Sequence, residues 1–133
     1  MKREKSCGCI VINDNNEVLL IHHNAGHWDF PKGHVEEKET EIQTAIREVK
    51  EETNIDVEVN EKFRYTTKYS PKEDVMKEVV YFLAKNISDN KEAQLEEVSE
   101  VKWVNFEEAL ETITYDTSKE ILMKLRKDLE EVK

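Results

Sequence analysis

The sequence predicts an α/β domain in which a mixed β-sheet lies between helices, an α/β/α sandwich. Apolar segments of strand length occur both before and after residues 40–54, where the apolar spacing is helical. Two more segments with helical spacing, 106–113 and 118–132, close the chain. Strands that alternate with helices in this way typically form a sheet covered on both faces. Because 133 residues suffice for one core, residues 1–133 are expected to form a single domain.

The first two strands are expected to form a β-hairpin. Residues 4–12 end in the apolar run Cys-Ile-Val-Ile, residues 18–21 supply the return strand, and the Asn-rich residues 13–16 form the turn. Cys7 and Cys9 are two residues apart, so on a strand their side chains point the same way. Because the chain has no further cysteine to complete a zinc site, both are expected to be reduced thiols in or near the core.

The segment 40–54 carries signals for both ends of a helix. Thr40 and Gln43 have the spacing of a capping box, and Asn54 stands where the chain leaves the helix and tolerates a left-handed backbone. Apolar residues recur on one face, at Ile42, Ala45, Ile46 and Val49. We therefore expect a helix of roughly 14 residues, with residues 24–27 in a loop before it.

The second half of the chain is expected to contain strands followed by two helices. In order, these segments are one or two strands at 57–69, a loop at 70–74, a strand at 76–86, an exposed connection at 87–97, a strand at 101–104 and helices at 106–113 and 118–132. Residues 79–83 form an uninterrupted apolar run, so this strand is expected to be buried on both faces.

Three glutamates near the end of the predicted helix point to a metal site. Glu48, Glu51 and Glu52 stand at i, i+3 and i+4, so their carboxylates share one patch. Like charges at these spacings repel, and the residues four positions downstream are Glu52, Ile55 and Asp56 rather than Lys. Three converging oxygen ligands without a basic partner suit a hard divalent cation, Mg²⁺ or Mn²⁺. The alternative is an acidic face that is only solvated.

The stretch 33–55 resembles the Nudix box, G-x5-E-x7-R-E-U-x-E-E-x-G-U, in which U is a large aliphatic residue. The positions that agree are Gly33, Glu39, Arg47, Glu48, Val49, Glu51, Glu52 and Ile55. Asn54 replaces the second glycine, and asparagine can supply the same backbone shape. The resemblance implies the Nudix fold over essentially the whole chain. It also implies an enzyme that cleaves a pyrophosphate bond joining a nucleoside diphosphate to another group.

The resemblance also implies roles for individual residues. The metal set that it implies is Gly33 (through its carbonyl), Glu48, Glu51 and Glu52, and the catalytic set is Glu39, Arg47, Glu51 and Glu97. In the family the position of Arg47 pairs with that of Glu39 to brace the loop against the helix. Many members carry a further acidic ligand or base in the region of Glu97 and Glu100, of which we prefer Glu97. The alternative for both is a charged loop, and which glutamate is the general base stays open.

Two motifs resemble the asymmetric dinucleoside tetraphosphate hydrolases within this family. Residues 27–34, His-Trp-Asp-Phe-Pro-Lys-Gly-His, are similar to the W-x-x-P-K-G-H of that group, and residues 77–84 are similar to a second stretch whose tyrosine stacks on adenine. The substrate-binding residues expected from this resemblance are His27, Lys32, His34, Lys77, Tyr81 and Tyr115. Val79 and Leu83 would share a strand face with Tyr81, so packing in the core is the alternative for this tyrosine.

The function implied is Mg²⁺-dependent hydrolysis of diadenosine tetraphosphate to ATP and AMP, with Mn²⁺ as a possible substitute. One alternative is another Nudix pyrophosphatase, acting on an oxidised nucleotide, a diphosphoinositol or a capped RNA 5′ end. A non-catalytic Nudix binding domain is the other alternative, and the intact box argues against it. A calcium-binding module is not expected, because no D-x-D-x-D-G loop occurs.

The amino-acid composition indicates which classes of binding partner to expect. The formal net charge of −10 does not favour long-range attraction to nucleic acids or anionic membranes, so neither is expected as a partner. The expected partner is a small nucleotide substrate, and a monomer is expected rather than an oligomer. No stretch approaches 18 apolar residues and the first residues lack a signal-peptide core, so a cytoplasmic location is expected.

Overall fold

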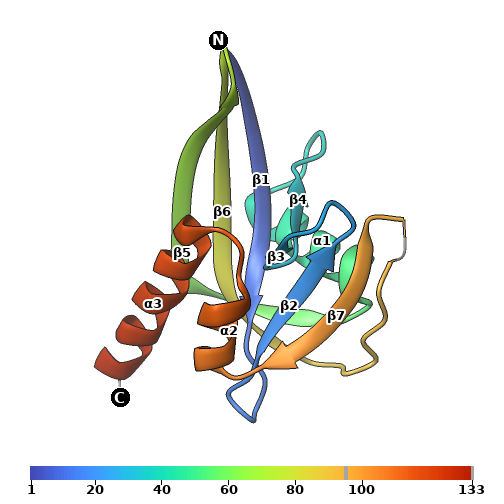
Figure 1. The fold of residues 1–133 in the computed structure, drawn as a ribbon, viewed down its shortest axis with the longest axis vertical. Coiled ribbons are helices and arrows are strands. Elements are labelled where there is room, and N and C mark those ends of the chain that lie inside the picture. The colour runs from blue at the N-terminus through green and yellow to red at the C-terminus, as the bar shows by residue number, and fades with distance from the viewer. Residues whose placement is uncertain (95, 133) are drawn as a thin grey trace.

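Two β-sheets and three helices make up the part of the chain that the structure, a computed structural model, describes: residues 1–94 and 96–132 (Figure 1). In chain order the elements are β1 (Lys2–Val11), β2 (Val18–His23), β3 (Trp28–Asp29), β4 (Lys32–His34), α1 (Glu41–Thr53), β5 (Val57–Lys72), β6 (Val75–Asn86), β7 (Val98–Val104), α2 (Phe106–Thr112) and α3 (Asp116–Glu131). None of the helices described is long and apolar enough to cross a membrane.

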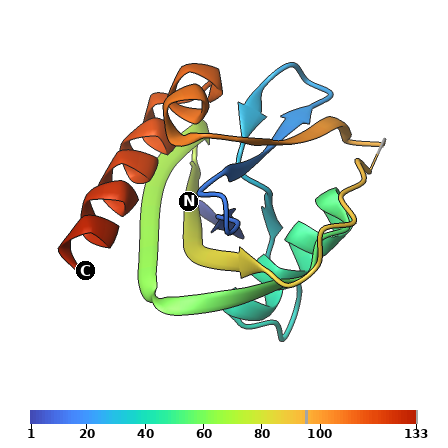
Figure 2. The same ribbon diagram turned by 90° about the horizontal axis from the view of Figure 1, so that it is seen from below.

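The larger sheet has the order β4-β1-β6-β5, and the smaller one has the order β3-β2-β7. β1 runs parallel to β6, whereas β4–β1 and β5–β6 are antiparallel pairs, so the larger sheet is mixed. Helix α1 packs on one face of it, and α2 and α3 pack on the other (Figure 2). The predicted α/β class with a mixed sheet and helices on both faces is confirmed.

The predicted hairpin of the first two strands is wrong. Residues 13–16 do form a turn, but β1 and β2 share only the isolated bridge between Ile12 and Val18. β2 pairs instead with β3 and β7 in the second sheet. Both edges of β1 are taken by β4 and β6, so the chain has to leave the first sheet after the turn.

The helix α1 begins and ends where its capping signals predict. The Thr40 hydroxyl accepts a hydrogen bond from the Gln43 N–H at 3.1 Å, and the Gln43 side chain accepts one from the Thr40 N–H at 2.9 Å. Asn54 adopts the left-handed conformation with φ 64°. The capping box and the left-handed exit are therefore both present.

The bounds of two strands differ from the sequence prediction, and two short strands were not predicted. β5 runs on to Lys72, so the predicted loop 70–74 is reduced to a turn at residues 73–74. β7 begins at Val98, because its pairing with β2 reaches His23. The short strands β3 and β4 lie in a region where no strand was predicted. Residue 95, within the predicted connection 87–97, lies outside the described residues.

Alternation along β1 divides the core into two layers. Cys7 and Cys9 face α1, whereas Ile10 faces α2 and α3. Both cysteines are free and fully buried, and burial raises the pKa of Cys7 to about 11 and that of Cys9 to about 12. They are protonated core thiols at neutral pH, as expected.

Candidate active site

A cavity of about 750 Å³ opens where the two sheets diverge beside α1. Its walls come from β1, the β2–β4 region, α1, β5, β6, the residue before β7 and the start of α3. All but one of the predicted site residues line it: His27, Lys32, Gly33, His34, Arg47, Glu48, Glu51, Glu52, Lys77, Tyr81, Glu97 and Tyr115. Glu39 does not line the cavity, but it accepts hydrogen bonds from two residues that do, Arg47 and Glu36.

Gly33 lies close to the Glu48 carboxylate. Gly33 lies on β4 opposite Cys7 of β1, and Glu48 projects from α1 toward it. A Cβ atom at position 33 would overlap the Glu48 carboxylate, so only glycine leaves room for this carboxylate. The pKa of Glu48 is raised, because the effect of burial exceeds the opposing effect of the Arg47 guanidinium.

Glu52 is the most buried carboxylate of the box, with 6% of its surface exposed. Its Oε1 accepts a hydrogen bond from the Lys32 backbone N–H at 2.8 Å, which ties α1 to β4. Burial raises the pKa of Glu52 to about 8, and the nearby Glu48 adds to this effect. Glu97, which also lines the cavity, contributes to the raised pKa of both carboxyls through space.

Arg47 joins the loop, the helix and the carboxylate patch. Its guanidinium donates two hydrogen bonds to Glu39, at 2.6 and 2.9 Å, and one to the His34 carbonyl at 2.9 Å. The hydrogen bonds from Arg47 lower the pKa of Glu39 to about 2. The pairing of Arg47 with Glu39 therefore exists, and it fastens the residues before α1 to the helix.

The glutamate patch does have a basic partner, contrary to the sequence prediction. Arg47 Nη1 lies 2.6 Å from Glu48 Oε2 and 3.1 Å from Glu51 Oε2. The prediction considered only residues four positions downstream, whereas the long Arg47 side chain reaches both carboxylates from the preceding part of the helix.

The donor set nevertheless fits a hard divalent cation. Glu48 and Glu52 are two half-buried or buried carboxyls with raised pKa values, so their negative charges are incompletely compensated. Carboxylate and carbonyl oxygens are the ligands that Mg²⁺ and Mn²⁺ prefer. Within residues 1–94 and 96–132, no three His, Cys, Asp or Glu side chains already surround a common point, and Arg47 holds Glu48 and Glu51 in ion pairs.

Aromatic rings line the end of the cavity away from the box. His27 stacks on His23 with centroids 4.6 Å apart and 9° between the planes, and it lies 5.4 Å from the Tyr115 ring. Tyr115 is 45% exposed, so its face is accessible. Tyr81 is only 1% exposed and meets Phe30 edge-on at 5.1 Å, an arrangement that favours the packing alternative for this residue.

Two lysine side chains line the part of the cavity wall that the larger sheet forms. Lys32 lies on β4 and Lys77 on β6, and burial together with the Lys32 charge lowers the pKa of Lys77. His34 follows on β4 and is exposed. Glu97 lies at the cavity, whereas Glu100 pairs with His22 on the smaller sheet and does not line it.

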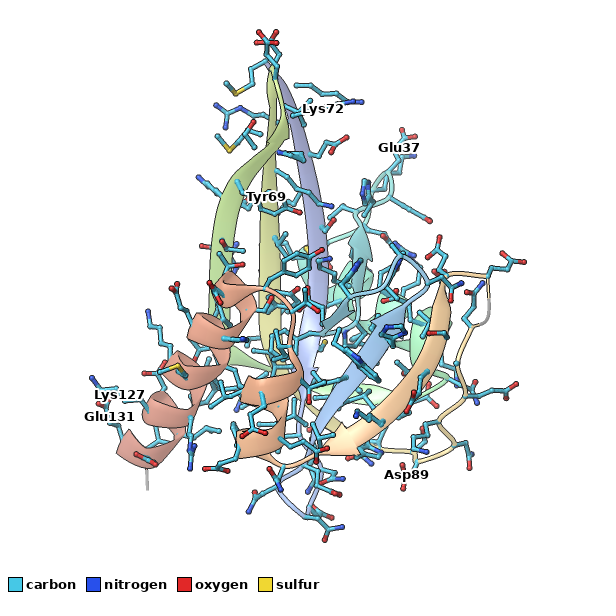
Figure 3. The ribbon with its side chains drawn as sticks, viewed as in Figure 1. Glu37, Tyr69, Lys72, Asp89, Lys127 and Glu131 are labelled. Atoms are coloured by element: carbon cyan, nitrogen blue, oxygen red, sulfur yellow. The ribbon has the colours of Figure 1, made fainter. Side chains whose placement is uncertain are left out.

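Sequence reasoning missed several residues of the cavity. Those with polar or aromatic side chains are Ser6, His23, Asp29, Phe30, Glu36, Thr67, Tyr69, Thr117 and Ser118. Tyr69 extends from the part of β5 that rises beyond α3, opposite Lys77 (Figure 3). Alternation of Tyr65, Thr67 and Tyr69 could have indicated one face of a strand, but not that it meets Lys77.

Comparisons with known proteins agree with the fold and the box. Residues 2–125 match the NUDIX domain model. The chain is similar to the asymmetrical bis(5′-nucleosyl)-tetraphosphatase of Mus musculus, with 32% identity over 133 residues that cover 89% of this chain and 90% of that protein. The enzyme of the same name from Caenorhabditis elegans is 39% identical over 102 residues, which cover 74% of this chain and 72% of that protein. The crystal structure of a C. elegans Ap4A hydrolase binary complex superimposes with a TM-score of 0.85 at 33% identity, covering 96% of this chain and 98% of that one.

Proposed function

The chain belongs to the Nudix hydrolase family, and we propose that it hydrolyses diadenosine tetraphosphate asymmetrically, to ATP and AMP, with the help of a divalent cation. The observation that carries this proposal is the composition of the cavity of about 750 Å³. Three glutamates of the box (Glu48, Glu51 and Glu52), two lysines and an accessible aromatic cluster all line it. A dinucleoside polyphosphate needs all three: a cleavage site, a cationic path for its phosphates and a surface for a base. The names of the relatives from mouse and C. elegans support the same substrate.

The cation would be held by Glu48, Glu51, Glu52 and the Gly33 carbonyl, with Mg²⁺ as the first choice and Mn²⁺ as a substitute. When bound, such an ion neutralises phosphate oxygens and lowers the pKa of a coordinated water. Arg47 would then keep its hydrogen bonds to Glu39, while the ion would replace it as the partner of the Glu48 and Glu51 carboxylates. Because Glu39 accepts two of its hydrogen bonds, Arg47 stays anchored in either state.

The remaining residues would position the substrate. Lys32 and Lys77 offer charge to the phosphates, and His34 lies at the end of β4 where a phosphate oxygen could accept its hydrogen. Tyr115 and His27 provide an accessible ring surface for a base, which binds by stacking. Water attacks the phosphorus at one end of the bridge, and the ATP moiety departs with the bridging oxygen. Glu97 is the candidate in the cavity outside the box to accept a proton from that water.

A substrate panel tests this proposal. Purified protein with Mg²⁺ is offered diadenosine tetraphosphate, nucleoside triphosphates including an oxidised one, nucleotide sugars, a diphosphoinositol and capped RNA, and products are resolved by chromatography. We expect diadenosine tetraphosphate to give the highest kcat/KM. A higher kcat/KM for any other member would assign the chain to a different branch of the family. Absence of turnover on every member would favour the non-catalytic alternative.

A further inference from the structure

Ser6 carries a buried hydroxyl without a partner. It lies on β1, an inner strand of the larger sheet, and is 1% exposed. Among the residues that the structure describes, its Oγ is the one buried side-chain polar atom with no hydrogen-bond partner. Burying a hydroxyl without a partner is unfavourable, so such an atom calls for a physical reason. Ser6 is also one of the residues that line the cavity, so its buried, unpaired hydroxyl belongs to the wall of the space where a ligand would lie.

The register of the sheet places two cations on either side of this hydroxyl. Ser6 is opposite His34 on β4 and Val79 on β6. Two residues further along β1, Gly8 is opposite Lys32, and two residues in the other direction, Glu4 is opposite Lys77. Residues two apart on a strand point to the same face. Lys32 and Lys77 are therefore diagonal neighbours of Ser6, one on each side, on the cavity face.

Within the described part of the chain, carboxyl groups act on both ammonium groups through space without pairing with them: Glu4 acts on Lys77, and Asp29 and Glu52 interact with Lys32. The ion pairs within residues 1–94 and 96–132 include neither Lys32 nor Lys77. The charge of Lys32 helps to lower the pKa of Lys77, so the two amines are near enough to repel each other. An anion that bridges them would relieve this repulsion and would meet the Ser6 hydroxyl between them.

We propose that Ser6 is a substrate-binding residue that donates its hydroxyl hydrogen to a phosphate oxygen held between Lys32 and Lys77. The contact deepens the proposed function and rests on it for the identity of the substrate: Ser6 would select for a phosphate chain long enough to extend from the box across β1 to Lys77. The hydroxyl stays unpaired until the substrate arrives, so its hydrogen bond contributes to binding rather than to folding.

Binding of inorganic tripolyphosphate tests this role without turnover. Titration calorimetry, without divalent metal and at low ionic strength, compares the wild type with Ser6→Ala. We expect the Kd to rise about 10- to 150-fold, the loss of one hydrogen bond to a charged acceptor. The Tm of the ligand-free variant should equal or exceed that of the wild type, because an unsatisfied buried hydroxyl has been removed. A purely structural serine would lower the Tm instead.

Two further variants sharpen the comparison. Cys7→Ala removes a similar atom from the neighbouring position of β1, on the face toward α1, and should leave the Kd unchanged. Ser6→Cys keeps the volume and a weaker donor, and should give a Kd between those of the wild type and Ser6→Ala.

The inference is overturned if Ser6→Ala binds tripolyphosphate within twofold of the wild type, if its Tm falls, or if the wild type binds no tripolyphosphate. Failure of the proposed function looks different. In that case diadenosine tetraphosphate is not cleaved by the wild type, while the Ser6 dependence of tripolyphosphate binding is still measured independently.

Discussion

The Glu48 carboxylate fills the space in which a side chain at Gly33 would begin. These residues mark the start and the middle of the box, and they belong to β4 and α1. The lack of a side chain at Gly33 therefore lets the Glu48 carboxylate lie directly against β4.

Replacing Gly33 tests this contact. In Gly33→Ala the new methyl group would overlap the Glu48 carboxylate, so Glu48 has to rotate away or β4 has to shift. We expect turnover with Mg²⁺ to fall by at least ~100-fold, equivalent to roughly 3 kcal/mol of transition-state stabilisation. Steady-state kinetics measures the loss. The matched control is Gly26→Ala, where φ is +102° but no atom lies within 4 Å of the added Cβ. This control should lose stability and keep its turnover; equal losses of turnover in both variants would refute the role of the contact.

Glu52→Gln should remove the metal-binding charge while the fold is kept. We expect turnover to fall by at least ~100-fold, as for loss of a charge that stabilises the transition state. Glu51→Gln is expected to behave in the same way, although Glu51 is far more exposed. Near-wild-type activity of either variant in Mg²⁺ would remove that residue from the metal set.

The raised pKa of Glu52 also predicts how metal-free stability varies with pH. The pKa of about 8 in the folded protein lies above the ordinary value for Glu, about 4.3. Between these two values the folded protein keeps a proton that the unfolded chain has released, so stability decreases as the pH rises through this window. Glu52→Gln has no such proton and should show a smaller decrease. Urea unfolding in the presence of a chelator, at pH 5 and pH 8, measures the change in the free energy of unfolding for the wild type and for Glu52→Gln. An equal change in the two proteins would contradict the raised pKa of Glu52.

Lys32→Ala is expected to affect long phosphate chains most. If Lys32 meets a phosphate remote from the cleaved bond, kcat/KM should fall more for diadenosine tetraphosphate than for a short pyrophosphate substrate. Parallel kinetics on the two substrates make the comparison. An equal loss on both would place Lys32 at the reacting phosphate or in a structural role.

Tyr115 and Tyr81 should respond differently to replacement by Leu. Tyr115→Leu removes an accessible ring face, so the KM for diadenosine tetraphosphate should rise roughly 5- to 150-fold with little change in Tm. Tyr81→Leu removes a ring that packs against Phe30, so it should lower the free energy of unfolding by roughly 1–3 kcal/mol. Kinetics beside melting curves separate the two effects. An unchanged KM for Tyr115→Leu would exclude stacking on this ring.

Local signals predicted the central helix well, because a capping box and a left-handed exit depend only on neighbours in sequence. Thr40, Gln43 and Asn54 behave as their residue types require. The hairpin prediction failed because adjacency in sequence does not determine strand pairing when both edges of β1 are already occupied. The length of β5 was underestimated for a related reason, since its end is fixed by pairing with β6.

Most of the site residues predicted from the sequence lie on the helix α1 or in two short motifs, residues 27–34 and 77–84. The contact of Arg47 with Glu48 and Glu51 was missed, because it depends on the direction of a long side chain rather than on spacing. Ser6 and Tyr69 were missed because each reaches the cavity only through cross-strand register. No pattern within their own segments marks either of them as a site residue.

Product analysis of diadenosine tetraphosphate hydrolysis tests the central claim most directly. The purified protein is incubated with this substrate and Mg²⁺, and the nucleotides are quantified by anion-exchange chromatography, with Glu52→Gln as the control for contaminating activity. The account predicts ATP and AMP in equal amounts from the wild type and a loss of at least ~100-fold in the control. Two molecules of ADP, or no consumption of the substrate by the wild type, would contradict it.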